Sequence, residues 1–376
     1  MKILVINWQC IKNPFGGGAE VHLHEIFKRI ASCGHSVTLL CCEIDNEPKD
    51  EVIDGIEILR RGSRNTFNFG VRKEYDTLVK SYKYDIVVDD VNKIPFYTPR
   101  YVKEPLLGIS HHFFGTSIFK EASIIAGLYV YIAEYFMKFV YNKIPFVVVS
   151  ESTLDEFKSK GFNTSDYEII YNAISQEEYP MNVLEKYNNP TFTFFGRLKK
   201  YKSIDHLILA FKNVLKQIPN ARLEILGKGD YEAQLKSLCI DLGIEEKVKF
   251  YGFINNEDKI KLLSKSHLVV NTSLKEGWGI TNIEANACGT PVISANSPGL
   301  RDSVKSGLSG ELYEYGNIDE LTEILIKYIL NKELLDEISQ GAVKWATEFS
   351  WDNSAKKMLD KINKVISNNI KIKNKS

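Results

Sequence analysis

The stretch Thr191-Phe192-Thr193-Phe194-Phe195-Gly196-Arg197-Leu198 decides the fold, because it restarts the pattern with which the chain begins. At the start of the chain, the apolar run Ile3–Ile6 leads into a glycine-rich loop at Gly16–Gly18 and then into a helical pattern from Ala19 to Ser32. Apolar strands that alternate with helices are typical of parallel sheets covered on both faces. The sequence therefore predicts two doubly wound α/β domains.

Further strand-like runs fill both halves of the chain. They lie at Val37–Cys42, Asp85–Val88, Leu106–Ser110, Phe146–Val149 and Tyr167–Tyr171, and then at Leu223–Leu226, Val248–Tyr251, Leu268–Asn271 and Pro291–Ser294. Between residues 172 and 190 the periodicity is weak, which is typical of a linker. We expect an N-terminal domain over residues 1–171, a hinge linker over 172–190, a C-terminal domain over 191–350 and a final helical segment over 351–376.

The composition excludes several classes of protein. The 376 residues include 48 Lys and Arg against 48 Asp and Glu, and this zero net charge argues against a general nucleic-acid binder, which normally has a basic excess. The 20 Phe and 19 Tyr residues exclude an intrinsically disordered chain. The six cysteines form no C-x-x-C pair and no metal-binding spacing, which favours a reducing, cytoplasmic setting.

The most apolar stretch, Ile124–Phe146, is expected to form a largely buried helix. It contains Glu134, Lys138 and Lys143, and its longest uncharged run is too short to cross about 30 Å of hydrocarbon. Contact with a membrane surface, through this stretch or through the lysine-rich tail from Lys356, is the alternative. We therefore expect a cytoplasmic protein, with weak peripheral contact at the inner membrane face as the minority alternative.

The strongest functional motif is Glu276–Ala285, which reads EGWGITNIEA and lies between a strand and a helix. Gly277 and Gly279 allow backbone N–H groups to approach an anion, and the start of a helix favours negative charge. A diphosphate fits this arrangement. The two carboxylates, Glu276 and Glu284, make sense beside an anion if they accept hydrogen bonds from sugar hydroxyl groups.

A second motif supplies positive charge. Arg197 and Lys202 follow directly after the strand Thr191–Phe195, where a guanidinium fork and an ammonium group can neutralise phosphate. Lys199 and Lys200 are interpreted as solvated surface residues. The sequence therefore predicts a phosphate site at the carboxyl end of this strand.

Two weaker motifs lie in the first half. The loop Gly16–Gly18 allows close backbone approach to a ligand, but it does not match the G-x-G-x-x-G spacing of dinucleotide-binding dehydrogenases. His111 and His112 follow the strand Leu106–Ser110, where one of them can donate a hydrogen bond to a sugar hydroxyl or a phosphate. No Cys or carboxylate stands at metal-ligand spacing nearby, so no metal site is predicted.

In this order, the motifs resemble those of the retaining glycosyltransferases of the GT-B fold, the glycosyltransferase family 4 type. Gly17-Gly18-Ala19-Glu20 resembles the family's G-G-x-E loop, and Gly196-Arg197-Leu198 with Lys202 is similar to its G-R-L…K motif. Residues 276–284 are similar to its E-x7-E motif. The resemblance covers nearly the whole chain and is highly specific.

Two small residues depart from the family pattern. Ala173 stands where the family has Gly in its Asn-Gly pair, and Ser203 stands where Gly customarily follows the motif lysine. Both are small residues in loops, and they leave the class assignment intact.

The resemblance implies two Rossmann-like domains that face each other across a cleft, with the nucleotide-sugar donor bound mainly by the second domain. Arg197 and Lys202 would hold the diphosphate, assisted by backbone N–H groups near Gly279, Ile280 and Thr281. Hinge closure and a C-terminal helix that crosses back to the first domain are also implied.

The remaining roles follow from the same resemblance. Glu284 would accept hydrogen bonds from the ribose, and Glu276 would contact the transferred sugar. The nucleobase would face the loop formed by Gly252, Phe253 and Ile254. From the first domain, the loop at Gly17 and Gly18 and one of the two histidines, of which we favour His112 over His111, would approach the donor.

The implied reaction is transfer of a hexosyl unit from a UDP- or GDP-sugar to a hydroxyl group of a glycan or lipid-linked acceptor, with retention of configuration. No cofactor or metal is expected, because Arg197 and Lys202 stabilise the leaving diphosphate while the acceptor attacks the same face. A nucleotide-sugar 2-epimerase of the same fold is the first alternative, although the E-x7-E and G-G-x-E motifs match the transferases better. A non-catalytic nucleotide-sugar-binding protein is the second, and the intact site residues argue against it.

Overall fold

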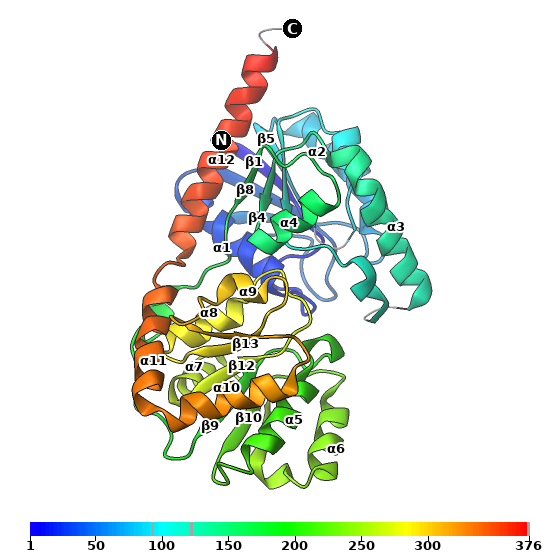
Figure 1. Ribbon diagram of the computed structural model, residues 1–376. Coiled ribbons are helices and arrows are strands. Elements are labelled where there is room, and N and C mark those ends of the chain that lie inside the picture. The colour runs from blue at the N-terminus through cyan, green and yellow to red at the C-terminus, as the bar shows by residue number, and fades with distance from the viewer. Residues whose placement is uncertain (92–93, 121–122, 374–376) are drawn as a thin grey trace. The chain divides into compact units, whose positions relative to one another are not determined.

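The computed structural model describes residues 1–91, 94–120 and 123–373, which form two compact units (Figure 1). The first unit comprises Met1–Asn172 together with the C-terminal segment from Trp351, and the second comprises Ala173–Ser350. The last three residues of the predicted C-terminal segment, 374–376, lie outside the described residues. Each unit is a doubly wound α/β domain, as the alternation of strands and helices predicts.

The first unit is built on an eight-stranded sheet. Its strands are β1 (Lys2–Ile6), β2 (Ser36–Cys41), β3 (Asp50–Ile53), β4 (Ile56–Arg60), β5 (Ile86–Val91), β6 (Leu106–Ser110), β7 (Phe146–Val148) and β8 (Tyr167–Ile169), in the order β3-β4-β2-β1-β5-β6-β7-β8. All neighbouring strands are parallel except β3 and β4. The chain reverses its direction of winding between β1 and β5, which is where ligands bind in open sheets of this kind.

The sequence did not predict the hairpin of β3 and β4, which adds an antiparallel edge strand. Asp54 and Gly55, with φ of 49° and 80°, form its two-residue turn. Positive φ at both central positions is the geometry of the tight hairpin turn whose twist matches that of its strands, and Asp-Gly is a preferred pair there. Ile53 pairs with Ile56 on either side of the turn.

The helices of the first unit are α1 (Gly18–Ser32), α2 (Phe67–Ser81), α3 (Ile124–Tyr141), α4 (Glu151–Ser159) and α12 (Trp351–Lys373), with short 3-10 turns η1 (Thr98–Arg100) and η2 (Gly115–Lys120). The helix α12 packs on α1, where Arg29 Nε donates to Asp352 Oδ1 at 2.6 Å. Farther along, Lys361 Nζ donates to the backbone and side-chain oxygens of Asp166, each at 2.8 Å. These contacts fix the C-terminal helix on the N-terminal unit.

One prediction for this unit is wrong. The stretch that includes α3 was expected to form a largely buried helix, but only 28% of α3 is buried. Both sides of this helix are apolar, so the pattern of hydrophobic residues does not show which side faces the core. The side that packs on the domain carries Gly127, Val130, Ala133, Met137 and Tyr141, while nine large apolar residues of the helix are exposed.

The second unit is built on a six-stranded, all-parallel sheet. Its strands are β9 (Thr191–Phe195), β10 (Arg222–Leu226), β11 (Val248–Gly252), β12 (Leu268–Asn271), β13 (Val292–Ala295) and β14 (Gly310–Tyr313), in the order β11-β10-β9-β12-β13-β14. Its helices are α5 (Ile204–Val214), α6 (Glu232–Asp241), α7 (Asn256–Lys265), α8 (Ile280–Ala287), α9 (Leu300–Ser303), α10 (Ile318–Leu330) and α11 (Lys332–Ala346), with 3-10 turns η3 (Gln176–Glu178), η4 (Lys200–Lys202) and η5 (Glu245–Lys247).

The two faces of this sheet differ in character. Phe192 and Phe194 of β9 are fully buried in the larger core with Phe211 of α5 and Leu325 of α10. A smaller core includes Val269 of β12, Leu263 of α7 and Ala285 of α8. Because alternate residues of β9 enter different layers, helices cover both faces of the sheet, and the strand ends are left to the loops.

The segment interpreted as a hinge linker belongs, from Ala173 on, to the second unit. Lys186 Nζ donates to Ser264 O at 3.0 Å, to Gly289 O at 2.9 Å and to Thr290 Oγ1 at 2.8 Å. A Cβ atom on Gly289 would lie 2.5 Å from the carbonyl oxygen of Asn182. The segment therefore packs closely against the rest of the second unit.

Candidate functional site

The loops that follow β9 and β12 meet at the carboxyl edge of the second sheet. The two strands are neighbours, and the direction of winding reverses between them. Thr272 Oγ1 donates to Lys202 O at 2.8 Å, and Leu274 N donates to Tyr201 O at 2.9 Å. The predicted phosphate motif and the predicted E-x7-E motif thus form one connected surface, at the position where open parallel sheets bind ligands.

Lys202 and Glu276 form an ion pair within this surface. Lys202 Nζ lies 2.5 Å from Glu276 Oε1, and both side chains are largely buried. Burial alone would lower the pKa of Lys202, but the negative charge of Glu276 outweighs it and the pKa is raised. Lys202 is therefore a fixed positive charge at the strand ends.

Arg197 lies nearby with an exposed side chain, and its charge acts to lower the pKa of Lys202. Lys199 turns away to pair with Asp230 at 2.8 Å, and Lys200 is exposed, as expected for solvated residues. Of the two predicted phosphate ligands, Lys202 is thus held by an ion pair and Arg197 is exposed.

Two glycines of the loop after β10 explain how these loops pack. A Cβ atom on Gly227 would lie 1.9 Å from the carbonyl oxygen of Gly196, and one on Gly229 would lie 2.0 Å from that of Leu198. The sequence suggested only a turn here. The structure shows that both glycines are needed for the backbone to pass directly against the loop that carries Arg197.

The helix α8 begins at the same edge, beside Glu276. Its N-cap residue is Gly279, which offers no side-chain cap. In the first turn, Ile280 N donates to Trp278 O at 3.0 Å and Asn282 N donates to Gly279 O at 2.9 Å. A Cβ atom on Gly279 would lie 2.3 Å from Ser303 Oγ, so the close packing requires glycine. Thr281 is half-buried and its Oγ1 accepts from Asn271 Nδ2 at 3.3 Å. An uncapped helix start next to Lys202 favours an anion.

Glu284 is held by two residues that the sequence did not indicate. Its Oε1 accepts from Lys259 Nζ and from Tyr179 OH, each at 2.7 Å. Lys259 comes from α7, and Tyr179 follows η3 in the segment over residues 173–190. Burial and the adjacent carboxylate raise the pKa of Tyr179, so this hydroxyl stays a donor. No local motif marks either residue, because their meeting depends on tertiary packing.

The predicted nucleobase loop follows β11. Gly252 has a φ of 71°, a left-handed conformation that glycine adopts without strain, and its carbonyl accepts from Gly227 N at 2.9 Å. Phe253 is 79% exposed, and Ile254 is half-buried. An exposed aromatic ring beside a strand end can stack on a flat ring.

In the first unit, the glycine loop leads into α1. Gly17 is the N-cap residue, and its N–H donates to Glu20 Oε2 at 2.6 Å. Gly18 is exposed, and a Cβ atom there would meet nothing within 4 Å. Glu20 thus caps the helix.

The two histidines after β6 have different surroundings. His111 is buried, its Nε2 lies 3.1 Å from Asp90 Oδ1, and its ring packs edge-on against His22 with centroids 5.1 Å apart. His112 is half-buried, 4.9 Å from the ring of Phe114. His111 is thus fixed by a carboxylate, and His112 is the more accessible of the two.

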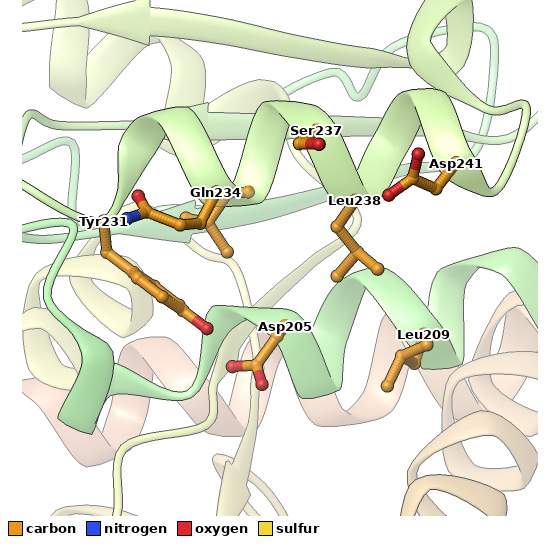
Figure 2. A pocket seen from close by; sticks show the side chains of 8 residues that line it. Asp205, Leu209, Tyr231, Gln234, Ser237, Leu238 and Asp241 are labelled. Carbon is orange, nitrogen blue, oxygen red and sulfur yellow. The ribbon is translucent and has the colours of Figure 1, made fainter.

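A separate hollow of about 410 Å³ lies between α5 and α6 (Figure 2). Among its lining residues are Asp205 and Leu209 of α5, Leu238 and Asp241 of α6, and Tyr231 just before α6. The hollow lies between two helices, and its two carboxylates would repel a phosphate. It does not contain the predicted site residues.

Comparison with known proteins gives two family matches in series. Residues 16–178 match the family described as Glycosyltransferase Family 4, and residues 175–345 match the family described as Glycosyl transferases group 1. Together these matches span all the motifs described above.

Similar individual proteins include an uncharacterized glycosyltransferase of Methanocaldococcus jannaschii, 29% identical over 96% of this chain and 97% of that protein. Another is a GDP-mannose-dependent monoacylated alpha-(1-6)-phosphatidylinositol monomannoside mannosyltransferase of Corynebacterium glutamicum, 29% identical over 54% of this chain and 58% of that protein. Among solved structures, HepE of Anabaena in complex with UDP-glucose has a TM-score of 0.75, with 20% identity over 97% of this chain and all of that chain. This last likeness concerns the fold, which is GT-B.

Proposed function

Because the chain belongs to the family 4 glycosyltransferases, with a C-terminal half of the group 1 type, we propose that it transfers a hexosyl unit from a UDP- or GDP-sugar to a hydroxyl group of a glycan or lipid-linked acceptor. We further propose that the anomeric configuration of the sugar is retained and that no metal ion takes part.

The observation that carries this proposal is the convergence of positive groups at one edge of the second sheet. Lys202 is held at the end of β9, Arg197 is exposed in the same loop, and α8 begins without a side-chain cap. A nucleotide sugar breaks at the bond to its β-phosphate, where negative charge develops. Preorganised positive groups at that point are usually the largest catalytic term, and in this proposal they replace a metal ion.

The carboxylates of Glu284 and Glu276 are assigned to different parts of the donor. Glu284 is held by Lys259 and Tyr179, with its Oε1 occupied by both, so Oε2 is the oxygen assigned to the ribose hydroxyl groups. Glu276 is proposed to contact the hydroxyl groups of the transferred sugar through the oxygen that does not face Lys202. The exposed ring of Phe253, next to Gly252 and Ile254, is assigned to the nucleobase.

The first unit is proposed to bind the acceptor and to contribute one histidine to the donor sugar. The greater accessibility of His112 favours it for this contact, and the buried pair of His111 with Asp90 would support the loop from behind. Gly18 leaves open space at the start of α1 for the same ligand.

The names of similar proteins support both donor classes. The corynebacterial relative is named for GDP-mannose and a phosphatidylinositol mannoside, and the Anabaena protein was solved with UDP-glucose. The first supports a lipid-linked acceptor, and the second supports UDP as the nucleotide.

The proposal is tested with a panel of UDP-, GDP- and other nucleotide sugars. Thermal unfolding identifies the binding nucleotide, since a ligand at about 100 times its Kd stabilises a protein by roughly 2.7 kcal/mol. The responding sugar donor is then incubated with acceptors, with and without EDTA, and the product's anomeric configuration is read by NMR. Activity abolished by EDTA and restored by a divalent cation would overturn metal independence. An inverted product would overturn retention, and a panel without a responder would overturn the donor assignment.

A further inference from the structure

The outward side of α3 is an apolar surface that the proposed reaction does not use. Among the described residues, α3 is the one helix long and apolar enough by composition to cross a membrane, yet most of it is exposed. Its nine exposed large hydrophobic residues are Ile124, Ile125, Leu128, Tyr129, Tyr131, Ile132, Tyr135, Phe136 and Phe139. Apolar patches of this extent on a protein surface usually mark an interaction site.

The arrangement of side chains on α3 reverses the usual order of a surface helix. At 3.6 residues per turn, Leu128, Ile132 and Phe139 lie along the middle of the outward side, with Tyr135 beside Leu128. Tyr129 and Tyr131 lie at its two edges. The residues that face the domain are small at Gly127 and Ala133 and large at Met137 and Tyr141. Aliphatic and Phe side chains flanked by tyrosine hydroxyl groups match the layering of a membrane surface, where Tyr sits at the level of the headgroups.

Both charged residues of α3 are turned away from this surface. Glu134 is buried, and its oxygens accept from Phe114 N at 2.7 Å and Gly115 N at 2.9 Å. The ammonium group of Lys138 lies against Gly161, 2.8 Å from where a Cβ atom would be. Within the described span of α3, the outward side therefore carries no charge.

These inward contacts also exclude a spanning helix. Met137 and Tyr141 are buried in a core cluster with Phe146 and Phe157, and Tyr141 OH donates to Asp89 at 2.7 Å. A helix that crossed the bilayer would lose this packing and leave Glu134 in hydrocarbon. The surface can only lie on a membrane.

Three exposed cations belong to segments that contact or follow α3. Arg100 is exposed and lies over the ring of Tyr97, whose hydroxyl donates to Ala133 O of α3 at 3.0 Å. Lys143 is exposed just beyond the end of α3. On α2, the exposed Arg72, which lies 4.0 Å from Asp76, follows one turn after Asn68, whose amide donates to Tyr129 OH.

The patch extends beyond α3 on the other edge as well. Phe119 of η2 is exposed, packs against Gly127 and has its ring 6.2 Å from that of Tyr131. At the Tyr129 edge, Phe69, next to Asn68, is 72% exposed. Figure 1 shows α3 at the periphery of the first unit, running beside its other helices rather than between them.

We propose that the outward side of α3 binds the surface of an anionic lipid bilayer, with its aliphatic and Phe side chains inserted at the acyl boundary and with Arg100, Lys143 and Arg72 facing the headgroups. An uncharged side bordered by cations complements an anionic membrane, whose surface attracts each cation. The inference does not depend on which sugar is transferred.

The test is co-sedimentation of the full chain with vesicles of phosphatidylcholine alone, or with about a third of the lipid replaced by phosphatidylglycerol. The variant Ile132→Gln with Phe139→Gln should lower binding to the anionic vesicles at least about tenfold, because two apolar side chains lose their insertion. The matched control, Ile240→Gln with Leu330→Gln, removes two exposed residues from helices of the second unit and should bind like the wild type.

A second pair of variants, Arg100→Gln and Lys143→Gln, tests the charge. Each should weaken binding to the anionic vesicles roughly fivefold and leave binding to phosphatidylcholine unchanged. A wild-type chain that stays in the supernatant with the anionic vesicles overturns the proposal. It is also overturned if sedimentation equilibrium shows a dimer that Ile132→Gln with Phe139→Gln separates, because a second copy then covers this surface. Unchanged thermal unfolding of the variants shows that the fold is intact.

Discussion

Lys202 and Glu276 form a largely buried ion pair, 2.5 Å between Nζ and Oε1, that joins the loops after two neighbouring parallel strands. The residue proposed to hold phosphate is thus already neutralised by the residue proposed to contact the sugar. A bound diphosphate would have to share Lys202 with this carboxylate. The pair therefore holds Lys202 in place and at the same time weakens its attraction for the nucleotide.

This competition predicts opposite effects of Glu276→Gln on binding and turnover. Removing the negative charge should tighten the binding of free UDP or GDP severalfold, because Lys202 is released and a like charge disappears beside the diphosphate. Turnover should fall at least about tenfold, because a contact to the transferred sugar is lost. Calorimetric titration and a transfer assay measure the two effects. Weaker nucleotide binding in this variant would contradict the competition.

Lys202 and Arg197 should contribute most of the stabilisation of the transition state. We expect Lys202→Ala or Arg197→Ala to lower turnover at least about 10²-fold, the usual effect of losing one donor that stabilises the transition state. The matched control is Lys199→Ala in the same loop, which removes a lysine paired with Asp230 and should leave turnover within about twofold. Near-normal turnover in both site variants would refute the phosphate assignment.

The cluster around Glu284 predicts a positioning role for Lys259. Glu284→Ala should weaken nucleotide binding about tenfold or more, through the lost ribose contact. Lys259→Met should also weaken it, by a smaller factor, since the carboxylate loses the ammonium that orients it at 2.7 Å. Calorimetry with the nucleoside diphosphate measures both, and Lys212→Met, which loses only a bond to Leu242 O, is the control. Equal affinity in Glu284→Ala and the wild type would remove the ribose assignment.

Much of the fold could be predicted because buried parallel strands appear in the sequence as short runs of apolar residues. Leu106–Ser110, Thr191–Phe195 and Leu268–Asn271 have the predicted bounds, and β1 and β10 differ by one residue. The hairpin of β3 and β4 was missed because it is half-exposed and its pattern is weak, although Asp54-Gly55 is a strong turn signal.

Only those site residues that belong to a local sequence motif could be predicted. Lys202 and Glu276 each follow a strand, so the parallel sheet brings them together. Lys259 and Tyr179 come from elements without a motif and are found only from the packing. Ser203, where the family customarily has Gly, takes a left-handed conformation with φ of 49° and bonds Tyr315 OH at 2.8 Å. The backbone turn is thus kept without glycine, at a cost that the sequence alone does not reveal.

A buried carboxyl group in the first unit predicts a pH dependence of stability. Burial raises the pKa of Asp89 to about 7, against hydrogen bonds from Thr98 and Tyr141 that lower it. As the pH rises from 3.8 towards 7, the unfolded chain ionises at this residue and the folded chain does not, so its contribution to stability is present at low pH and is lost through this window.

The difference between the wild type and Asp89→Asn isolates this effect. Relative to the variant, the free energy of unfolding of the wild type should fall by about 2 kcal/mol between roughly pH 5 and pH 7 and then level off. Denaturant unfolding at several pH values measures it. A wild type that gains stability over this range relative to the variant would show that Asp89 is ionised in the folded protein.

The close contact between Gly289 and the segment over residues 173–190 gives a last prediction. Gly289 has a φ of 68°, and a Cβ atom there would lie 2.5 Å from Asn182 O and 2.6 Å from Val183 Cα. Gly243 has a similar φ of 62°, but a Cβ atom there would meet nothing within 4 Å. Gly243→Ala should therefore cost only the strain of the left-handed backbone, about 1–2 kcal/mol. Gly289→Ala should cost at least about 2 kcal/mol more, because backbone atoms must move. Urea unfolding compares the two, and equal losses would mean that the segment over residues 173–190 is not packed against the second unit in solution.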